Sequence, residues 1–271
     1  MLKQRIITAL WLAPLALVGF FALHGFAFLA FISVVVGLAG WEWARLAGYD
    51  TEAQRIAYAV LVAVTLVLLS NISALIMPLL YLAAVWWLLA IAMVLSFPNS
   101  IAFWGGNLGK RVIGLIILVP AGLGLLVLKT LPQGNMLILS LMLLVWGADI
   151  GAYFFGRAFG KLKLVPRVSP GKSWAGLFGG VLTSLCIAIG LAVYLNIPID
   201  QFVPVLLGAV LVVLFSVVGD LTESMFKRQM GIKDSSQLLP GHGGVLDRID
   251  SLTAAAPMFA LLLLLSGWTL P

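Results

Sequence analysis

The sequence predicts an all-α polytopic membrane protein with about nine transmembrane helices. Of its 271 residues, 62% are hydrophobic and only 10% are charged, and the mean hydropathy is +1.14. A soluble domain carries roughly 25% charged residues, and no polar stretch here is long enough to form a separate soluble domain. We therefore expect one integral membrane domain over residues 1–271.

Apolar segments of nearly spanning length recur along the whole chain. A transmembrane helix needs about 20 predominantly apolar residues, and we expect such helices at 6–23, 27–46, 56–70, 75–97, 112–129, 136–156, 175–195, 203–220 and 251–268. The third segment is short, and the boundary before residue 75 is weakly marked. Lys3 and Arg5 precede the first segment as in a signal peptide, but no small-residue cleavage site follows, so we expect an uncleaved span.

The charges between these segments indicate how the helices are oriented. When the connections are assigned alternately to two sides, 15 of the 16 Lys and Arg residues fall on the side of the N-terminus, and Lys129 falls on the other. Because cytoplasmic loops are enriched in Lys and Arg, we expect a cytoplasmic N-terminus and an outside C-terminus, in a bacterial-type inner (plasma) membrane. The net charge of +6 is then explained by orientation and attraction to membrane lipids, and we expect no nucleic-acid partner.

Charged residues are concentrated in residues 219–251, which hold nine of the 26 in the chain. If the eighth helix continues past the membrane edge, five polar residues share one of its faces, namely Asp220, Glu223, Ser224, Lys227 and Arg228. A second group begins the ninth helix, namely Asp247, Asp250 and Ser251. Ionisable residues at membrane depth or at the membrane edge indicate a functional site.

Two helices thus offer carboxylates to one site. Asp220 follows a nearly unbroken apolar run, where a lone Asp costs about 2.5–3.5 kcal/mol on insertion scales. With Asp247 and Asp250 it makes an oxygen site suited to Mg²⁺, an ion that binds one or two carboxylates plus substrate phosphates. The alternative is that Asp247 and Asp250 only cap the ninth helix, because acidic side chains suit the dipole of a helix N-terminus.

A glycine-rich loop, residues 240–244 (PGHGG), leads into that helix. Backbone N–H groups near a helix start can bind phosphate oxygens, so Gly243 and Gly244 are candidate phosphate ligands. His242 is a catalytic candidate, with a purely structural role as the alternative. Together with flanking cations, this loop predicts a metal–polyphosphate site; the cations are Lys227, Arg228, Lys233 and Arg248.

A second polar loop, residues 157–174, is predicted on the same side of the membrane. Asp149 and Tyr153 place a polar stripe on the sixth helix, and cations follow it, namely Lys161, Lys163, Arg167 and Lys172. Residues 171–173 (GKS) resemble part of a P-loop, but the upstream glycine spacing and a preceding strand are absent, so we reject that motif. For Lys161 and Lys163 the alternative role is membrane orientation and contact with anionic lipids.

Residues 224–250 resemble the signature of the phosphatidate cytidylyltransferase (CDP-diacylglycerol synthase) family. That signature runs Ser-x-apolar-Lys-Arg, four residues, Lys-Asp, and then Pro-x-His-Gly-Gly-apolar-x-Asp-Arg-apolar-Asp, and the match from Ser224 to Asp250 has no gap. The similarity extends to residues 149–160 and 169–174, with Ser173 where many relatives have Thr. Ala175 stands where many have Glu or Gln, so no polar role carries over to it. Residues 1–140 match only in hydropathy.

The resemblance implies that CTP and phosphatidate react to give CDP-diacylglycerol and pyrophosphate. It also implies a divalent metal with Asp220 and Asp247 as ligands, a monovalent cation such as K⁺ beside it, and a homodimer. We then expect residues 141–271 to carry the catalytic helices and cytoplasmic loops. Residues 1–140 are expected to pack, to face lipid or to form the dimer.

In the site so predicted, carboxylates hold Mg²⁺ and cations bind the triphosphate or the lipid phosphate, on the cytoplasmic side. The catalytic candidates are Asp220, Lys227, Arg228, His242, Asp247 and Arg248, and the metal ligands are Asp220, Asp247 and Asp250. The substrate-binding candidates are Asp149, Tyr153, Arg167, Ser169, Lys172, Ser224, Lys233, Gly243 and Gly244. Two alternatives stay open: a CTP-dependent polyprenol or dolichol kinase, and an ion-coupled transporter. The second is disfavoured, because the acids gather at one membrane edge and no internal repeat is evident.

Overall fold

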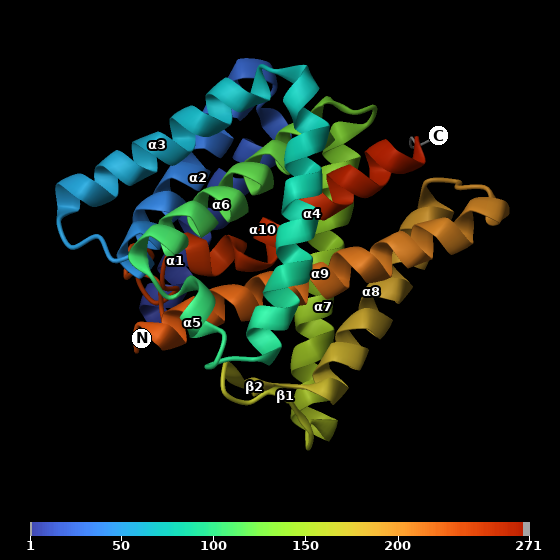
Figure 1. Cartoon of the computed structure of the whole chain (residues 1–271). Coiled ribbons are helices and arrows are strands. Elements are labelled where there is room, and N and C mark those ends of the chain that lie inside the picture. The colour runs from blue at the N-terminus through green and yellow to red at the C-terminus, as the bar shows by residue number, and fades with distance from the viewer. Residues whose placement is uncertain (1, 268–271) are drawn as a thin grey trace.

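The computed structural model describes residues 2–267 as a bundle of helices (Figure 1). Its elements are α1 (Leu2–Leu17), α2 (Gly25–Leu46), α3 (Glu52–Ser70), α4 (Ser73–Leu95), α5 (Ile101–Trp104), α6 (Asn107–Thr130), α7 (Gly134–Phe159), β1 (Lys163–Val165), β2 (Ser169–Ser173), α8 (Trp174–Tyr194), α9 (Phe202–Gln229) and α10 (Leu246–Ser266). A π-helical turn, Val18–Ala22, extends α1, and a 3₁₀ turn, Ile199–Gln201, precedes α9. The C-terminal end and the side chains of Lys3 and Arg5, which entered the orientation prediction, lie outside the described residues.

Eight helices within residues 2–267 are long and apolar enough to cross a membrane, which confirms the all-α, multi-pass membrane fold. The predicted first span differs, because Ile6–Ala22 is a shorter apolar helix. The division of residues 56–97 into two helices is confirmed, since α3 ends at Ser70 and α4 begins at Ser73. Helix α9 is longer than the predicted eighth span and continues to Gln229. The orientation of the helices in the membrane stays a prediction.

The loop between α7 and α8 contains a small antiparallel hairpin that the sequence did not predict. Its strands, β1 and β2, pair with Lys163 opposite Ser173 and Val165 opposite Ser169. Val165 and Val168 are buried, because the hairpin lays its apolar side chains against the helices. The loop expected at residues 157–174 is therefore partly ordered as a sheet that joins α7 to α8 at one end of the bundle (Figure 1).

The strand β2 runs directly into α8. Ser173 is the N-cap residue of α8, and its Oγ accepts a hydrogen bond from the backbone N–H of Gly176 at 3.1 Å, as is typical of serine at a helix start. Lys172 therefore lies on a strand and not in a phosphate-binding loop, and the rejection of a P-loop agrees with this geometry.

Small residues allow α7 and α8 to pack closely. A Cβ atom added to Gly151 would lie 2.6 Å from the carbonyl oxygen of Gly179, and one added to Gly180 would lie 2.8 Å from that of Ala148. Transmembrane helices approach each other through such residues. The close packing carries Asp149 of α7 next to the hairpin that bears Lys172.

Aromatic side chains hold the end of α9 that leads into the charged loop. The ring centroid of Phe226 lies 4.7 Å from that of Trp43 in α2 and 4.4 Å from that of Trp104 in α5. All three side chains are essentially buried, and Nε1 of Trp43 donates to the carbonyl oxygen of Lys110 at 2.8 Å. The N-terminal half of the chain therefore fixes the end of α9 beside Lys227.

Helix α10 occupies the middle of the bundle, where it packs against α9, α6 and α4 (Figure 1). The approach of α6 requires a glycine, because a Cβ on Gly124 would lie 2.7 Å from the backbone of Ala256. Contacts on several sides thus set the position of α10 and of the acids in its first turns.

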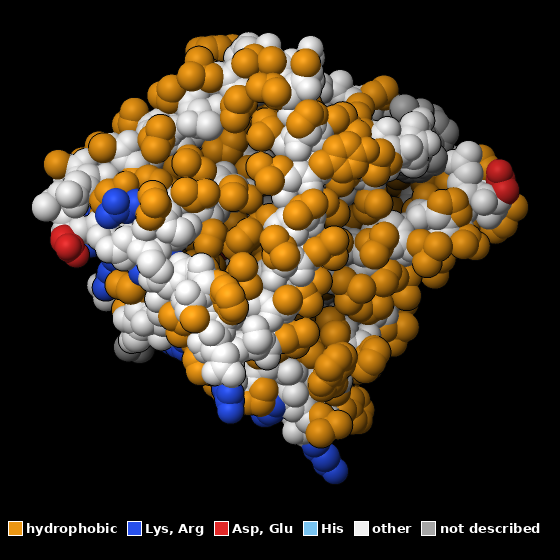
Figure 2. Space-filling model, viewed as in Figure 1, with side chains coloured by type: hydrophobic (Ala, Val, Ile, Leu, Met, Phe, Trp, Pro, Cys, Tyr) orange, Lys and Arg blue, Asp and Glu red, His pale blue; other side chains and the backbone are white. Residues whose placement is uncertain are grey.

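Apolar side chains cover most of the face shown in Figure 2, and Lys and Arg gather along its lower and left edge. Large apolar side chains are widely exposed, as at Phe26 (83%) and Phe103 (87%). Exposed surface of this kind suits contact with lipid tails. The edge with the cations is the end at which Figure 1 places α5 and the β hairpin.

Candidate active site

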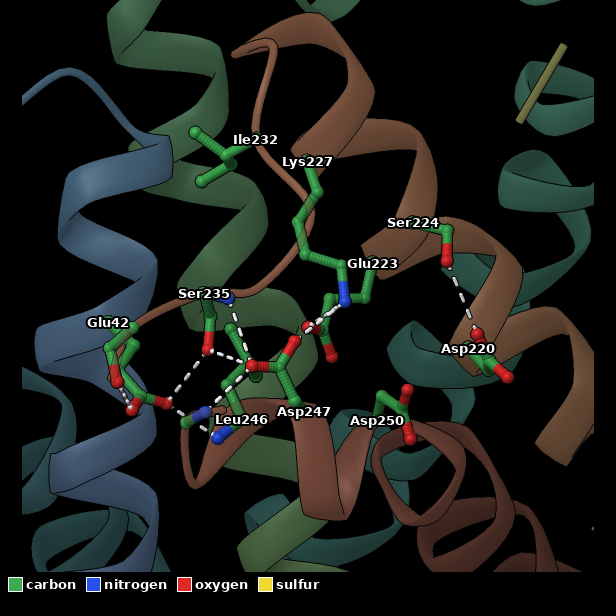
Figure 3. Close-up of polar contacts among 12 residues, drawn as sticks. Glu42, Asp220, Glu223, Ser224, Lys227, Ile232, Ser235, Leu246, Asp247 and Asp250 are labelled. Atoms are coloured by element: carbon green, nitrogen blue, oxygen red, sulfur yellow. Dashed lines mark hydrogen bonds and ion pairs between the residues drawn. The ribbon is translucent and has the colours of Figure 1, made fainter. Parts of the chain in front are cut away.

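Five charged residues of α9 and α10 lie near one another, namely Asp220, Glu223, Lys227, Asp247 and Asp250 (Figure 3). The two helices touch at Gly219, where an added Cβ would lie 2.5 Å from the carbonyl oxygen of Asp250 and 3.2 Å from Cβ of Ala254. Asp220 follows this contact immediately, so its carboxylate lies in the same region as that of Asp250 (Figure 3). The close approach at Gly219 thus assembles acids from two helices.

Lys227 links α9 and α10 through a buried ion network. Its Nζ lies 2.9 Å from Oε1 of Glu223 and 2.7 Å from Oδ1 of Asp247. The three side chains are only 9%, 4% and 6% exposed, respectively. Removing one member of such a network leaves a buried charge without a partner, so Lys227 first of all holds the two helices together.

The other oxygen of Asp247 organises the loop between α9 and α10. Oδ2 accepts hydrogen bonds from the backbone N–H and the hydroxyl of Ser235, at 2.9 and 2.8 Å, and from the N–H of Gly244 at 2.8 Å. Both oxygens of Asp247 are therefore engaged inside the protein.

Glu42 of α2 binds the same loop from its other side. Its carboxylate accepts from the hydroxyl of Ser236 at 2.5 Å, from that of Ser235 at 3.3 Å, and from the N–H groups of Val245 and Leu246 at 3.0 and 2.6 Å. Figure 3 shows Glu42 and Asp247 on the two sides of Ser235. Glu42 is 1% exposed.

These contacts give the glycine-rich loop a structural role that the sequence did not predict. The N–H groups of Gly244, Val245 and Leu246 point to carboxylates of the protein itself, so the N–H of Gly244, expected to be a phosphate ligand, donates here to Asp247. The physical reason is that buried N–H groups need acceptors, and Glu42 and Asp247 supply them. Gly243 has a φ of +83°, which a glycine adopts without strain.

The opposite side of the site is more open. Nζ of Lys172 lies 2.6 Å from Oδ2 of Asp220, and both side chains are 27% exposed. The hydroxyl of Ser224 donates to Oδ1 of Asp220 at 3.3 Å. Asp149 interacts electrostatically with Asp220, Lys172 and Arg248, and Asp250 with Asp220, Lys172 and Lys227. The hairpin and the helices α7, α9 and α10 thus contribute charged groups to one region.

A cavity of about 240 Å³ lies beside the ion pair of Lys172 and Asp220. Its lining includes Asp149 and Tyr153 of α7, Lys172 and Ser173 of the hairpin, and Val217 of α9. The hydroxyl of Tyr153 accepts from Arg157 at 3.2 Å. The cavity therefore combines a cation, an acid and hydroxyl groups with apolar helix surface.

The other residues predicted for the site differ in how far they are buried and in whether they form hydrogen bonds within the protein. Arg228 donates to the carbonyl oxygens of Val168 and Ile232, both at 3.2 Å, so it ties the hairpin to α9. Nδ1 of His242 is buried and has no hydrogen-bond partner among the described residues. The exposed cations are Arg167 in the hairpin turn, Lys233 in the loop and Arg248 on α10. Ser169 begins β2 and is half-buried.

The carboxylates fit a divalent cation only together with a further ligand. Within residues 2–267, no three His, Cys, Asp or Glu side chains are grouped so that they could hold a metal ion by themselves. Asp220 and Asp250 share one region, and the buried Oε2 of Glu223 has no hydrogen-bond partner there among the described residues. Two carboxylates completed by phosphate oxygens and water match the way Mg²⁺ binds.

Sequence reasoning assigned no role to Glu42 or Ser235. The criterion that selected Asp220, an acid inside an apolar run, also applies to Glu42 within residues 27–46. Its partners lie 193 to 204 residues away, and nothing in a single sequence indicates that pairing.

Comparisons with known proteins extend the resemblance to nearly the whole chain. A model described as the cytidylyltransferase family matches residues 3–266. A phosphatidate cytidylyltransferase of Pseudomonas aeruginosa is 59% identical over 271 residues, which is 100% of both chains. That of Haemophilus influenzae is 41% identical, over 96% of this chain and 98% of the relative, and that of Brucella suis is 38% identical, over 96% and 92%. The expectation that residues 1–140 match only in hydropathy is therefore wrong.

Proposed function

The chain belongs to the cytidylyltransferase family, and from this premise we propose that it transfers CMP from CTP to phosphatidate. A phosphate oxygen of phosphatidate attacks the α-phosphorus of CTP and forms a new P–O bond. The bond from that phosphorus to the bridging oxygen of the β-phosphate breaks. The products are CDP-diacylglycerol and pyrophosphate.

The single observation that carries this proposal is the contact between Lys172 and Asp220, at 2.6 Å. It joins the basic hairpin to the acidic face of α9, beside a cavity that also reaches apolar helix surface. Two polyanions must meet in this reaction, and the electrostatic cost of bringing them together is the main obstacle. A site at the end of a membrane bundle, with cations and carboxylates side by side, suits a water-soluble triphosphate and a lipid phosphate.

We assign the metal to the open side of the site. Asp220 and Asp250 would hold Mg²⁺, and Asp247 would contribute only Oδ1, the oxygen that Lys227 now contacts. When bound, Mg²⁺ would neutralise phosphate charge and stabilise the developing charge of the transition state. The monovalent cation expected from the family resemblance stays a prediction.

The cations divide into two groups. Lys172, Arg167, Lys233 and Arg248 lie on the accessible parts of the hairpin, the loop and α10, and would bind the triphosphate or the lipid phosphate. Lys227 and Arg228 are engaged with protein groups and would act mainly by holding the helices and loops in place. No strong base is required, because the attacking phosphate oxygen is already anionic.

The placement in the membrane follows from the distribution of cations. We propose that the edge bearing the Lys and Arg residues in Figure 2 faces the cytoplasm of a bacterial inner membrane. CTP would reach the site from that side, and the acyl chains of phosphatidate would lie between helices. A homodimer, with residues 1–140 as the candidate interface, is part of the same proposal.

A transfer assay on the purified protein in detergent tests this function. With CTP labelled in its α-phosphate, Mg²⁺ and phosphatidate, we expect labelled CDP-diacylglycerol and one pyrophosphate for each turnover. Omission of phosphatidate is the control, and polyprenol is the competing acceptor. Transfer of the γ-phosphate to polyprenol, with release of CDP and no liponucleotide, would overturn the proposal.

A further inference from the structure

We propose that Glu42 is a positioning residue of this reaction, which holds the α9–α10 loop so that Asp247 and the start of α10 keep their places in the site. The inference rests on the proposed function. Glu42 lies on α2, and its role is to set the positions of groups that do the binding.

The hydrogen bonds of Glu42 account for both of its oxygens. Oε1 accepts from the hydroxyl of Ser236 and the N–H of Val245, and Oε2 from the N–H of Leu246 and the hydroxyl of Ser235. A carboxylate without such partners would be costly in an apolar interior. Here it supplies acceptors to the first N–H groups of α10, which have none within their own helix, so a residue of α2 fixes where α10 begins.

The hydroxyl of Ser235 connects Glu42 to Asp247. It lies 2.8 Å from Oδ2 of Asp247 and 3.3 Å from Oε2 of Glu42. A hydroxyl has one proton and donates one hydrogen bond at a time, so Ser235 alternates between the two acceptors, and the shorter distance favours Asp247. The N–H of Ser235 donates to the same oxygen at 2.9 Å. A displacement of the loop away from Glu42 therefore also moves two of the donors that orient Asp247.

The close fit around Gly244 indicates that this arrangement is specific. A Cβ atom at Gly244 would lie 2.2 Å from Oγ of Ser235 and 2.3 Å from Oε1 of Glu42. Only glycine lets the loop pass between them and donate its N–H to Asp247. The Glu42 carboxylate and the glycine-rich loop are thus complementary in shape as well as in hydrogen bonding.

The fold of α2 does not depend on Glu42 alone. Trp43 packs on Phe226 and donates to Lys110, and Arg45 reaches the carbonyl oxygen of Ser235 at 3.5 Å. Thr8 of α1 donates to the carbonyl oxygen of Pro240 at 2.8 Å. Loss of the Glu42 charge should therefore loosen the loop while the helix stays in place.

The substitution Glu42→Gln tests the inference with little change in size. One carboxylate oxygen becomes an NH₂ group, which faces backbone N–H donors and cannot accept from them. The matched control is Glu52→Gln, because Glu52 is exposed at the start of α3, where it accepts from Trp41, far from the loop in sequence. Ser236→Ala removes one donor to Glu42 without changing a group that contacts Asp247.

We expect Glu42→Gln to lower kcat for CDP-diacylglycerol formation by about 10- to 100-fold, as is typical when a residue that orients a ligand-binding group is changed. The half-saturating Mg²⁺ concentration should rise, and amide hydrogen exchange of residues 235–246 should accelerate, with α2 amides unchanged. Ser236→Ala should give a smaller loss of about two- to tenfold. Glu52→Gln should match the unmodified protein in all three measurements.

Unchanged kcat, Mg²⁺ dependence and exchange in Glu42→Gln would overturn the inference. If Glu42→Gln does not fold, Ser236→Ala decides: unchanged turnover and unchanged exchange at residues 245 and 246 would overturn it. The failure of the proposed function is a separate result, because then the unmodified protein and Glu52→Gln would also lack the transfer activity.

Discussion

The region around Glu42 and Asp247 and the region around Asp220 and Asp250 flank the first turns of α10, but they are organised differently. In the first, carboxylate oxygens accept from hydroxyl and backbone N–H groups, and Glu42 is 1% exposed. In the second, Asp220 and its partner Lys172 are 27% exposed and lie beside a cavity of about 240 Å³. Buried carboxylates with several internal donors hold the loop and the start of α10 in place, whereas Asp220 is partly exposed and paired with a partly exposed cation, so it is more accessible to a ligand.

The largest expected effect is on the open side of the site. Asp220→Asn should reduce kcat/KM for CTP by roughly 10²–10³-fold, because one charge that stabilises the transition state is lost. The thermal midpoint in detergent should change little, since partly exposed ion pairs contribute little to stability. Asp200→Asn, in the exposed turn before α9, is the control. Normal Mg²⁺-dependent turnover in Asp220→Asn would contradict the assignment of the metal to this side.

On the buried side, the expected effect is on stability. Lys227→Met leaves the carboxylates of Glu223 and Asp247 without their cation and should lower the free energy of unfolding by about 3–5 kcal/mol. Denaturant titration in mixed micelles, followed by circular dichroism, measures the change. The double variant Lys227→Met/Glu223→Gln should recover part of the loss, because one of the two unpaired charges is gone.

If Lys227→Met kept its stability but lost CMP transfer, the division into a structural region and a ligand-binding region would not hold for Lys227. That result would identify Lys227 as a substrate ligand, as the sequence predicts, and not as the link between α9 and α10.

The smallest expected effect belongs to Ser224. Its hydroxyl donates to Asp220 at 3.3 Å, a long hydrogen bond that adds little to the orientation of the carboxylate. Ser224→Ala should change KM and kcat by no more than about threefold, as measured by initial rates at saturating and limiting CTP. A loss as large as that of Asp220→Asn would show that the hydroxyl contacts substrate.

The sequence predicted the helices well because hydropathy is a local property. Runs such as residues 203–220 show a span directly, and the spacing of Asp220, Glu223 and Lys227 shows a shared helix face. The hairpin at residues 163–173 was missed, because its strands are short and rich in polar residues. The bond from Glu42 to the loop was missed for a different reason: it joins residues some 200 positions apart, and their pairing depends on the packing of helices α2 and α10.

The glycines illustrate the same limit. From the motif at residues 240–244 we predicted a loop that binds phosphate. In the structure, position 244 requires a glycine because the side chains of Ser235 and Glu42 leave no room for a Cβ atom. The sequence indicated no role for Gly219, although its lack of a side chain allows α9 and α10 to approach and brings Asp220 near Asp250. Whether a glycine serves a ligand or a close helix contact depends on its neighbours in space.

The contact between Lys172 and Asp220 has a consequence for how the site handles charge. Lys172 is a built-in counter-ion, so the site is close to electroneutral at that point before any substrate arrives. If Mg²⁺ takes its place at Asp220, the ammonium group is released next to the cavity where a phosphate would lie. Binding would then be an exchange of counter-ions: Asp220 would pair with the metal and Lys172 with the phosphate, so that this end of the bundle would not carry a large uncompensated charge.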